Sequence, residues 1–536
     1  MSTDCYPITV VPGLHRLFLD YCAGDAVVRP FYPSLPPETG WQARPAIAAH
    51  WPELVRLLAV QNPSPSAAPA IEALAQGAGT VLTGQQIGIL GGPLFTPFKA
   101  AAALARARQA TAAGKPHAAI FWLATEDHDF DEIDHVTFPS RRELIKLKYA
   151  PDSPIQAALP VGNLVIDKGI TPLIDRAWEI LGASDAMDVL ADAYQPGRTF
   201  TAAFAEFYAR MFAAQGLLIL DAAGRDFHRL GAPVLRAAIE RADELHSALL
   251  DRNRQLETAG YHAQVAVMPQ SSLLFLVDKD SGARLALKRT PPSAAEPAGL
   301  WQAGRQNYST VDLVGILDAE PERISPSALL RPVFQDFLLS TSLIIGGPAE
   351  VAYFAQSAVL YERILGRRTH AEPRFSATLV EPAIAELLQK HGLTPQQLFN
   401  QTESSLAQLL AARSMPAEGQ ERLAATGTAL DAELTALLGY LTTIDAGLGQ
   451  SATKAASKMR YQMNRMRRLT ANFQLQREAS LGRQAETLSN ALYPRGVLQE
   501  RLHGAAFYFA RYGIELAETI TQQAACTCTG HTVMWL

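Results

Sequence analysis

The apolar positions in the first third of the chain form two runs, and a loop of unusual composition follows each. The first run, residues 80–83, precedes a glycine-rich loop and an alanine-rich segment that ends near residue 113. The second run, residues 118–124, leads directly into an acidic loop. A strand, a helix and a second strand in this order predict a βαβ unit, in which polar chemistry gathers where the strands end.

The pattern continues through the middle of the chain with longer interruptions. Apolar runs predict strands at residues 136–138, 144–149, 217–221 and 342–345. Helical spacing predicts helices at residues 172–215, 225–259 and 332–340. Three further runs, at residues 265–268, 273–278 and 283–287, predict antiparallel strands. We therefore expect an α/β fold with a parallel sheet and an antiparallel insertion.

After residue 373 the sequence becomes mainly helical. Apolar residues alternate spacings of four and three, which is a heptad pattern, at Leu430, Leu434, Leu437, Leu441, Ile444 and Leu448. The register slips near residue 448 and then resumes as far as Phe473. This pattern predicts either an antiparallel coiled coil within the chain or a seam between two copies. We expect the segment from residue 491 onward to pack back on the core.

The tripeptide Gly-Gly-Pro occurs twice, at residues 91–93 and 346–348. Each copy follows an apolar run and opens a predicted helix. Exposed N–H groups and the helix dipole attract anions at such positions. The two helix starts come from distant parts of the chain and could face one pocket.

Composition limits the classes of function that remain. A chain of 536 residues is expected to contain two or more structural units. A net charge of −5 argues against broad attraction to nucleic acid or membranes. No run approaches the ~18 apolar residues of a membrane helix, and we expect no signal peptide. The cysteines form no C-x-x-C pair, so we expect reduced cytoplasmic thiols rather than a zinc site or a disulfide framework, at Cys5, Cys22, Cys526 and Cys528.

The glycine-rich loop at residues 83–93 is neither a G-x-G-x-x-G motif nor a P-loop. As a ligand loop, its glycines would let the backbone approach a ligand, and Gln85 and Gln86 would hydrogen-bond it. Lys99, in the following helix, would neutralise an anion. The alternative is a tight crossover between strand and helix with two surface glutamines.

The acidic loop contains Glu126, Asp127, His128 and Asp129 directly after an apolar run. A histidine among carboxylates holds its proton more readily, so His128 could act as a general acid or contact an oxyanion or phosphate. A metal site, using His128, Asp127 and His135, is the weaker alternative because no H-x-x-x-H spacing occurs. The loop could also simply cap neighbouring helices.

Arg331 precedes a predicted helix and could hold a carboxylate or a phosphate with two hydrogen bonds. The structural alternative is a salt bridge with Asp336 or another acid. Glu350 and Tyr353, in the first turns of the second Gly-Gly-Pro helix, are either ligand contacts or ordinary helix residues. A basic run at residues 454–468 is expected to be a solvated face, an anion-binding wall being the alternative. It lacks the interleaved aromatic residues that would favour RNA binding.

Four motifs, at residues 83–96, 121–133, 325–333 and 346–353, together resemble the cysteine-adding enzymes of bacillithiol biosynthesis, the BshC family. The resemblance implies a Rossmann-like core with connecting-peptide insertions, and a helical coiled-coil domain through which the protein forms a homodimer. On this basis the core is residues 1–373, with insertions at about 139–210 and 255–320. The coiled-coil domain is 374–490, and a C-terminal segment, 491–536, packs on the core.

The same resemblance implies the last step of bacillithiol synthesis, in which cysteine is joined to the amine of glucosaminyl-malate. The family core is similar to nucleotidyltransferases and class I synthetases, whose usual signature is H-x-G-H. The corresponding loop here contains a single histidine, His128. The means of activating the cysteine carboxyl is therefore open, with ATP as the natural activator and no metal expected.

These residues form one candidate site in a cytoplasmic ligase. The candidate catalytic residues are His128, Asp127 and Glu126. The candidate substrate- or nucleotide-binding residues are Thr83, Gly84, Gln85, Gln86, Gly91, Gly92, Lys99, Asp129, Arg331, Gly347, Glu350 and Tyr353. The expected partners are small substrates and a second copy of the chain, without nucleic acid or membrane. The alternative function is a nucleotide-binding assembly factor that acts through its coiled coil without catalysis.

Overall fold

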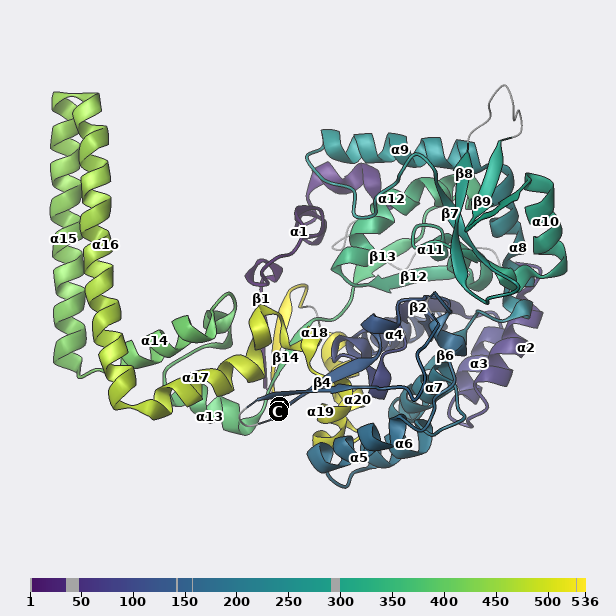
Figure 1. The fold of residues 1–536 in the computed structure, drawn as a ribbon, viewed down its shortest axis with the longest axis horizontal. Coiled ribbons are helices and arrows are strands. Elements are labelled where there is room, and N and C mark those ends of the chain that lie inside the picture. Colours follow the sequence, from purple (N-terminus) through teal and green to yellow (C-terminus); the bar gives the residue numbers. More distant parts are fainter. Residues whose placement is uncertain (1, 35–47, 141–142, 157, 291–298, 527) are drawn as a thin grey trace.

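The fold is built on a parallel sheet of five strands with helices on both faces (Figure 1). The computed structural model describes residues 2–34, 48–140, 143–156, 158–290, 299–526 and 528–536. The order of the strands is β13-β12-β2-β3-β6, and all neighbouring strands are parallel. Their bounds are β2 Gly79–Gln85, β3 His117–Leu123, β6 Leu218–Asp221, β12 Thr341–Gly346 and β13 His370–Pro373. The predicted parallel sheet is therefore confirmed.

Alternate residues of each strand enter different hydrophobic clusters, as the two-residue period of a strand requires. Val81 and Phe121 pack on one face, whereas Leu82 and Trp122 pack on the other. The first face is covered by α4 (Phe95–Ala112), α5 (Ile170–Leu181), α6 (Asp185–Ala193) and α7 (Phe200–Met211). The second is covered by α1 (Arg16–Cys22), α2 (Trp51–Gln61), α3 (Ala68–Ala75), α8 (Arg225–Glu240), α9 (Ala242–Thr258), α11 (Arg331–Leu339) and α12 (Pro348–Leu365). Burial on both faces explains why these strands read as continuous apolar runs.

An antiparallel sheet lies beside this core, in the order β10-β9-β8-β7-β11. Its strands are β7 Ser271–Val277, β8 Arg284–Thr290, β9 Leu300–Ala303, β10 Gln306–Tyr308 and β11 Ile324–Pro326, and α10 (Thr310–Ala319) precedes β11. β11 leads within a few residues to Arg331, the first residue of α11. The antiparallel sheet thus helps to place Arg331 at the edge of the parallel sheet. A separate two-stranded ribbon pairs β4 (His135–Pro139) with β5 (Leu144–Lys148).

Two predictions for this region are wrong. The helix expected at residues 225–259 is two helices, α8 and α9, because the backbone leaves the helical conformation at Arg241. Residues 265–268 form no strand. The side-chain amide of Gln356 hydrogen-bonds both the N–H and the carbonyl of Val265, each at 2.9 Å, and so takes the place of a neighbouring strand.

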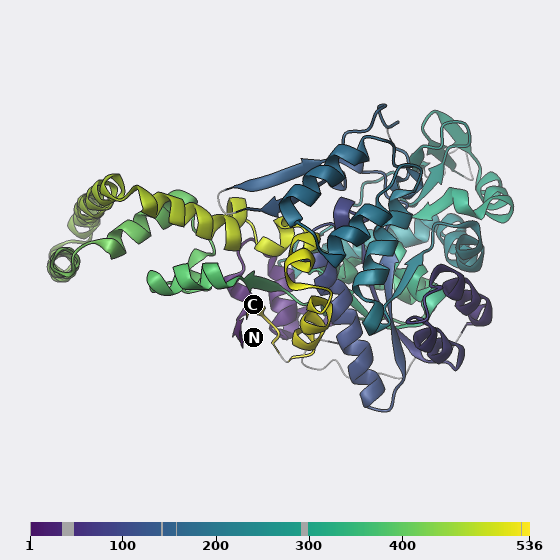
Figure 2. The same cartoon turned by 90° about the horizontal axis from the view of Figure 1, so that it is seen from below.

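Two long helices, α15 (Ala417–Ile444) and α16 (Ala446–Arg477), form an antiparallel hairpin that projects from the rest of the molecule (Figures 1 and 2). The chain reverses at Asp445, whose carboxylate accepts a hydrogen bond from the N–H of Leu448 at 2.8 Å. The heptad register slips here because one helix ends and the next begins at this turn. The connecting elements are α13 (Pro382–Lys390), α14 (Glu403–Ser414) and α17 (Ala479–Leu492).

Only part of the predicted heptad seam lies inside this hairpin. Leu434 of α15 is buried, as are Ala456 and Met463 of α16. Leu437 and Ile444 are exposed, as are several apolar residues of α16. The basic run lies on α16, away from the core, so it does not form a wall of the core domain.

The C-terminal segment does return to the core. α18 (Gln499–Leu502), α19 (Ala505–Tyr512) and α20 (Leu516–Ala524) follow α17, and α19 and α20 pack against α4. The carbonyl of His503 accepts a hydrogen bond from the N–H of Leu94 at 2.7 Å, and the N–H of Ala505 donates to the carbonyl of Gly92 at 2.9 Å. These bonds fix the end of the glycine-rich loop.

The two ends of the chain meet in a three-stranded sheet, β1-β15-β14, formed by Ser2–Tyr6, His531–Trp535 and Ala377–Val380. Cys5 and Cys528 form a disulfide with a Cα–Cα distance of 5.8 Å, so the expectation of reduced thiols is wrong for this pair. Their separation of 523 residues hides the pairing in the sequence, and the antiparallel pairing of β1 with β15 brings them together. Among the described residues, no helix has the length and apolar character needed to cross a membrane.

Candidate active site

A cavity of about 240 Å³ lies where β2, β3 and β12 end. Predicted site residues from four distant segments line it together. They are Gly84, Gln85, Gln86, Lys99, Asp127, Arg331, Gly347, Glu350 and Tyr353. The wall also contains residues that were not predicted, namely Phe95, Trp122, Gln335, Phe354, Arg374 and Arg501. The tertiary structure therefore gathers most of the predicted binding residues around one small cavity.

The two Gly-Gly-Pro segments do not both face this cavity. Gly347 and Pro348 line it, but the first segment is packed against aromatic side chains. The hydroxyl of Tyr208 donates a hydrogen bond to the carbonyl of Gly91 at 2.7 Å. Gly91 has a φ of +84°, and a Cβ there would lie 2.5 Å from the ring of Phe207. The prediction of two facing helix starts is wrong for the first motif, whose glycines serve a buried turn.

Lys99 is not a free cation in this cavity. Its ammonium group donates to the carbonyl of Gly84 at 2.5 Å and forms an ion pair with Glu350 at 2.5 Å. The same Glu350 oxygen accepts a hydrogen bond from the N–H of Gly347 at 2.7 Å. Burial lowers the pKa of Lys99, although the Glu350 charge opposes the shift. Lys99 and Glu350 therefore join the start of α12 to the end of β2.

Arg331 is one of two arginines in the cavity wall that form no ion pair among the described residues, and Arg501 is the other. The alternative salt bridge with Asp336 does not form, because Arg367 lies 2.6 Å from that carboxylate. No carboxylate among the described residues lies within ion-pair distance of Arg331. Burial acts to lower the pKa of Arg331, but the neighbouring Tyr353 and the Glu350 and Asp127 carboxylates together outweigh it, so the pKa is raised. Burial in turn raises the pKa of Tyr353 to about 12, so it remains a neutral hydroxyl.

Asp127 provides a carboxylate at the opposite side of the site. It accepts hydrogen bonds from the side chain of Gln86 at 2.9 Å and from the N–H of His128 at 2.8 Å. Burial acts to raise the pKa of Asp127, but these two hydrogen bonds and the charges of Arg284 and Arg331 together outweigh it, so the pKa is lowered. Asp127 is therefore ionised at neutral pH and can accept a proton or bind a cation.

His128 lies beside the cavity rather than in its wall. Its ring Nδ1 is 3.8 Å from Asp127, too far for a hydrogen bond, and has no hydrogen-bond partner among the described residues. The ring centre is 6.1 Å from that of Phe275. The imidazole is therefore held only loosely in this arrangement.

Three further predicted residues point away from the cavity. The hydroxyl of Thr83 donates to the carbonyl of Ile345 at 3.0 Å and joins β2 to β12. Asp129 is exposed. Glu126 contacts His228 at 2.8 Å, and the ring of His228 is fully buried. Burial acts to lower the pKa of His228, but the Glu126 charge outweighs it and the pKa is raised.

Family models match nearly the whole chain. The N-terminal Rossmann-like domain of bacillithiol biosynthesis BshC matches residues 1–367, and its C-terminal coiled-coil domain matches residues 377–536. The chain belongs to the BshC family. A relative from Koribacter versatilis is 40% identical over the full length of both chains, and one from Solibacter usitatus is 34% identical over the full length of both. A relative from Salinibacter ruber is 30% identical over 98% of this chain and 97% of its own. Each bears the name "putative cysteine ligase BshC".

Two residues near the acidic loop of this BshC-family protein, His228 and Arg284, were not predicted from the sequence. His228 belongs to no sequence motif. It lies on α8, and its ring contacts the carboxylate of Glu126. Arg284 comes from β8, and its guanidinium lies 3.8 Å from the ring centre of Phe275. It donates to the hydroxyl of Ser325 at 3.0 Å and is close enough to Asp127 to lower the pKa of that carboxyl. The sequence signal that indicated such partners was the excess of acids in the loop at residues 126–134.

Proposed function

We propose that this BshC-family protein is a ligase that joins cysteine to the amine of glucosaminyl-malate, in the last step of bacillithiol biosynthesis. The observation that supports this most is the pairing, in one small cavity, of an ionised Asp127 with an Arg331 that has no carboxylate partner. A cysteine zwitterion carries the complementary charges. Names of relatives and the match to the family models support the same assignment.

In the proposed reaction the cysteine carboxyl is first made electrophilic, because a carboxylate and an amine do not condense in water. The amine nitrogen then attacks the acyl carbon, the amide bond forms, and the activating group leaves. Asp127 would accept the amine proton or bind the ammonium group of cysteine, and Arg331 would hold a carboxylate. His128 would donate a proton or stabilise the developing negative charge.

ATP is the activator that we propose. The cavity of about 240 Å³ suits a group the size of cysteine. It is smaller than the ~300–1,000 Å³ of typical pockets for larger ligands, so a whole nucleotide does not fit within it. The requirement for a nucleotide is therefore tested directly, by assaying the reaction with and without ATP.

We also propose that the protein works in the cytoplasm as a homodimer joined through α15 and α16. Apolar side chains on the outer faces of this hairpin support a second copy as the partner. They include Leu437, Ile444, Met466, Leu469 and Phe473. A two-helix hairpin that buries only one narrow seam leaves such residues in water unless another surface covers them.

The test supplies the purified chain with cysteine and glucosaminyl-malate, with and without ATP, and seeks the amide product by mass spectrometry. Arg331→Gln should reduce the yield strongly, whereas Arg468→Gln, on the distant hairpin, is the matched control. Absence of product under every nucleotide condition, together with tight nucleotide binding, would instead favour an assembly factor.

His128→Ala tests the acidic loop separately. Because the imidazole makes no side-chain hydrogen bond and is partly exposed, its removal should leave the melting temperature nearly unchanged while product is lost. Unfolding of this variant would show that His128 is structural and would remove it from the proposed mechanism.

A further inference from the structure

A second and larger cavity, of about 990 Å³, lies between the N-terminal segment, α4, β13 and the C-terminal loops. It shares Arg374 and Arg501 with the wall of the candidate active site. Three of the four cysteines of the chain also line it, namely Cys22, Cys526 and Cys528. This concentration of sulfur in one cavity has no role in the proposed ligase reaction.

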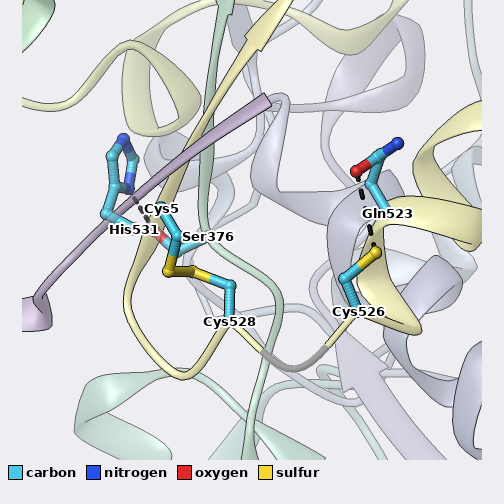
Figure 3. Close-up of a disulfide and its surroundings, with 6 residues drawn as sticks. All are labelled: Cys5, Ser376, Gln523, Cys526, Cys528 and His531. Atoms are coloured by element: carbon cyan, nitrogen blue, oxygen red, sulfur yellow. Dashed lines mark hydrogen bonds between the residues drawn. A yellow bond between two sulfur atoms is a disulfide. The ribbon is translucent and has the colours of Figure 1, made fainter. Parts of the chain in front are cut away.

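Figure 3 shows the sulfur atoms of Cys5, Cys526 and Cys528. Cys528 is one of the residues that line the cavity, and Cys5 is not. The two are joined by the disulfide. Cys526 is an exposed free thiol whose sulfur lies near the side chain of Gln523. Burial raises the pKa of the Cys22 thiol to about 12, so Cys22 stays protonated and unreactive. A nucleophile in the cavity would therefore attack the sulfur of Cys528, and the sulfur of Cys5 would be the leaving group.

The charges of the cavity favour an acidic ligand. Its ionised side chains are three arginines and two glutamates. Arg106 pairs with Glu372 at 2.6 Å, and Arg374 pairs with Glu500 at 2.5 Å. Within the described ranges Arg501 has no ion-pair partner, so one positive charge is left over.

The disulfide also controls how the cavity wall is held. β1 is an edge strand, almost entirely exposed, that pairs only with β15. The residues that follow it, including Ile8, Val11 and Leu14, form part of the wall. The covalent link between Cys5 and Cys528 therefore anchors the segment that closes this side of the cavity.

We propose that the Cys5–Cys528 disulfide is an exchange site for small acidic thiols that enter this cavity. The thiolate of the ligand attacks the sulfur of Cys528 and forms a mixed disulfide. The bond between Cys528 and Cys5 breaks, and the Cys5 thiolate takes up the proton that the ligand thiol released. No external oxidant is needed, because one disulfide replaces another. Exchange releases β1 and loosens the wall that adjoins the active site.

A cytoplasmic location would favour a regulatory role for this disulfide. Only this regulatory role rests on the proposed function. Disulfides in cytoplasmic proteins are usually transient, catalytic or redox-sensing rather than structural. The product of the proposed ligase would itself be a small acidic thiol. The exchange chemistry, however, requires no ligase activity and is measured without the ligase substrates.

The experiment uses the full chain purified without reductant and treated with glutathione, an acidic thiol, or with cysteamine, a cationic thiol. After an acid quench, peptide mass spectrometry should find glutathione on Cys528, a free thiol at Cys5 and no adduct on Cys526. Compared at equal thiolate concentration, glutathione should react roughly tenfold faster than cysteamine, an effect expected of electrostatic attraction. Arg501→Gln should remove this preference, whereas Arg477→Gln, on α16, should retain it.

Several results would overturn the proposal. One is the absence of the Cys5–Cys528 bond from the purified chain, and another is the absence of any glutathione adduct. An adduct on Cys5 instead of Cys528 would show attack from outside the cavity. Equal rates for the two thiols would refute the acidic ligand class. Hydrogen exchange should become faster at residues 8–14 after glutathione treatment, and an unchanged rate would refute the control of the wall. Loss of ligase activity in the separate assay would not affect any of these readouts.

Discussion

Replacing Lys99 by methionine should destabilise the core by about 3–5 kcal/mol, the usual effect of removing one partner of a buried ion pair. Lys99 is 3% exposed and Glu350 is 25% exposed, and their charged atoms are 2.5 Å apart. Methionine keeps most of the aliphatic stem, so the lost energy comes from the charge and its hydrogen bonds. The Glu350 carboxylate would remain at the start of α12 without its cation.

Glu350→Gln should destabilise the core by a similar ~3–5 kcal/mol, because it leaves the buried Lys99 ammonium without its carboxylate. The amide can still accept the hydrogen bond from Gly347, and Lys99 keeps its bond to the carbonyl of Gly84. The double variant should be more stable than the sum of the single effects predicts. Contacting residues typically show coupling energies of ~0.5–3 kcal/mol, and this buried pair should lie in the upper half of that range.

The assay is urea unfolding of the wild type, both single variants and the double variant, followed by tryptophan fluorescence. Ligase kinetics on the same four proteins separate structure from substrate binding. If the two substitutions were additive within ~0.5 kcal/mol, the ion pair would not be a structural link. A Lys99→Met variant of full stability with a raised KM would restore the original idea that Lys99 binds a substrate anion.

Three other features give independent tests. Burial lowers the pKa of His531 to about 4, and that of His503 to about 4 as well. Between about pH 4 and 6.5 the unfolded chain therefore binds the extra protons, and each histidine should lower stability with decreasing pH by up to ~1.4 kcal/mol per unit. His531→Gln should remove its own share of this slope in urea titrations at several pH values. Sedimentation should show a dimer that Leu469→Asp with Phe473→Asp converts to a monomer, and a monomeric wild type would contradict the proposed interface. Gly91→Ala should lower stability by ~1–3 kcal/mol more than Gly114→Ala, because both glycines have positive φ but only Gly91 lacks room for a Cβ; equal melting temperatures would refute this.

The sequence by itself determined the elements whose signals lie within one segment. The continuous apolar runs predicted the parallel strands, and the loops that follow two of them predicted that Gly84 and Asp127 would lie at the same edge of the sheet. This succeeds because the carboxyl ends of parallel strands must meet at one edge of the sheet. The four motifs likewise sufficed to identify the BshC family, because they record local chemistry directly.

The tertiary structure alone decided which partners the side chains would choose. Lys99 pairs with Glu350, and Glu126 contacts His228. The partners in each pair lie far apart in the sequence, so no local pattern predicts them. The side chain of Gln356 hydrogen-bonds the backbone of Val265 in place of a partner strand, and the strand predicted there does not form. The same reason explains the heptads: their spacing predicts an apolar stripe, but only the packed hairpin shows which residues are inside. The disulfide is the extreme case, because two cysteines 523 residues apart become neighbours only when the first and last strands pair.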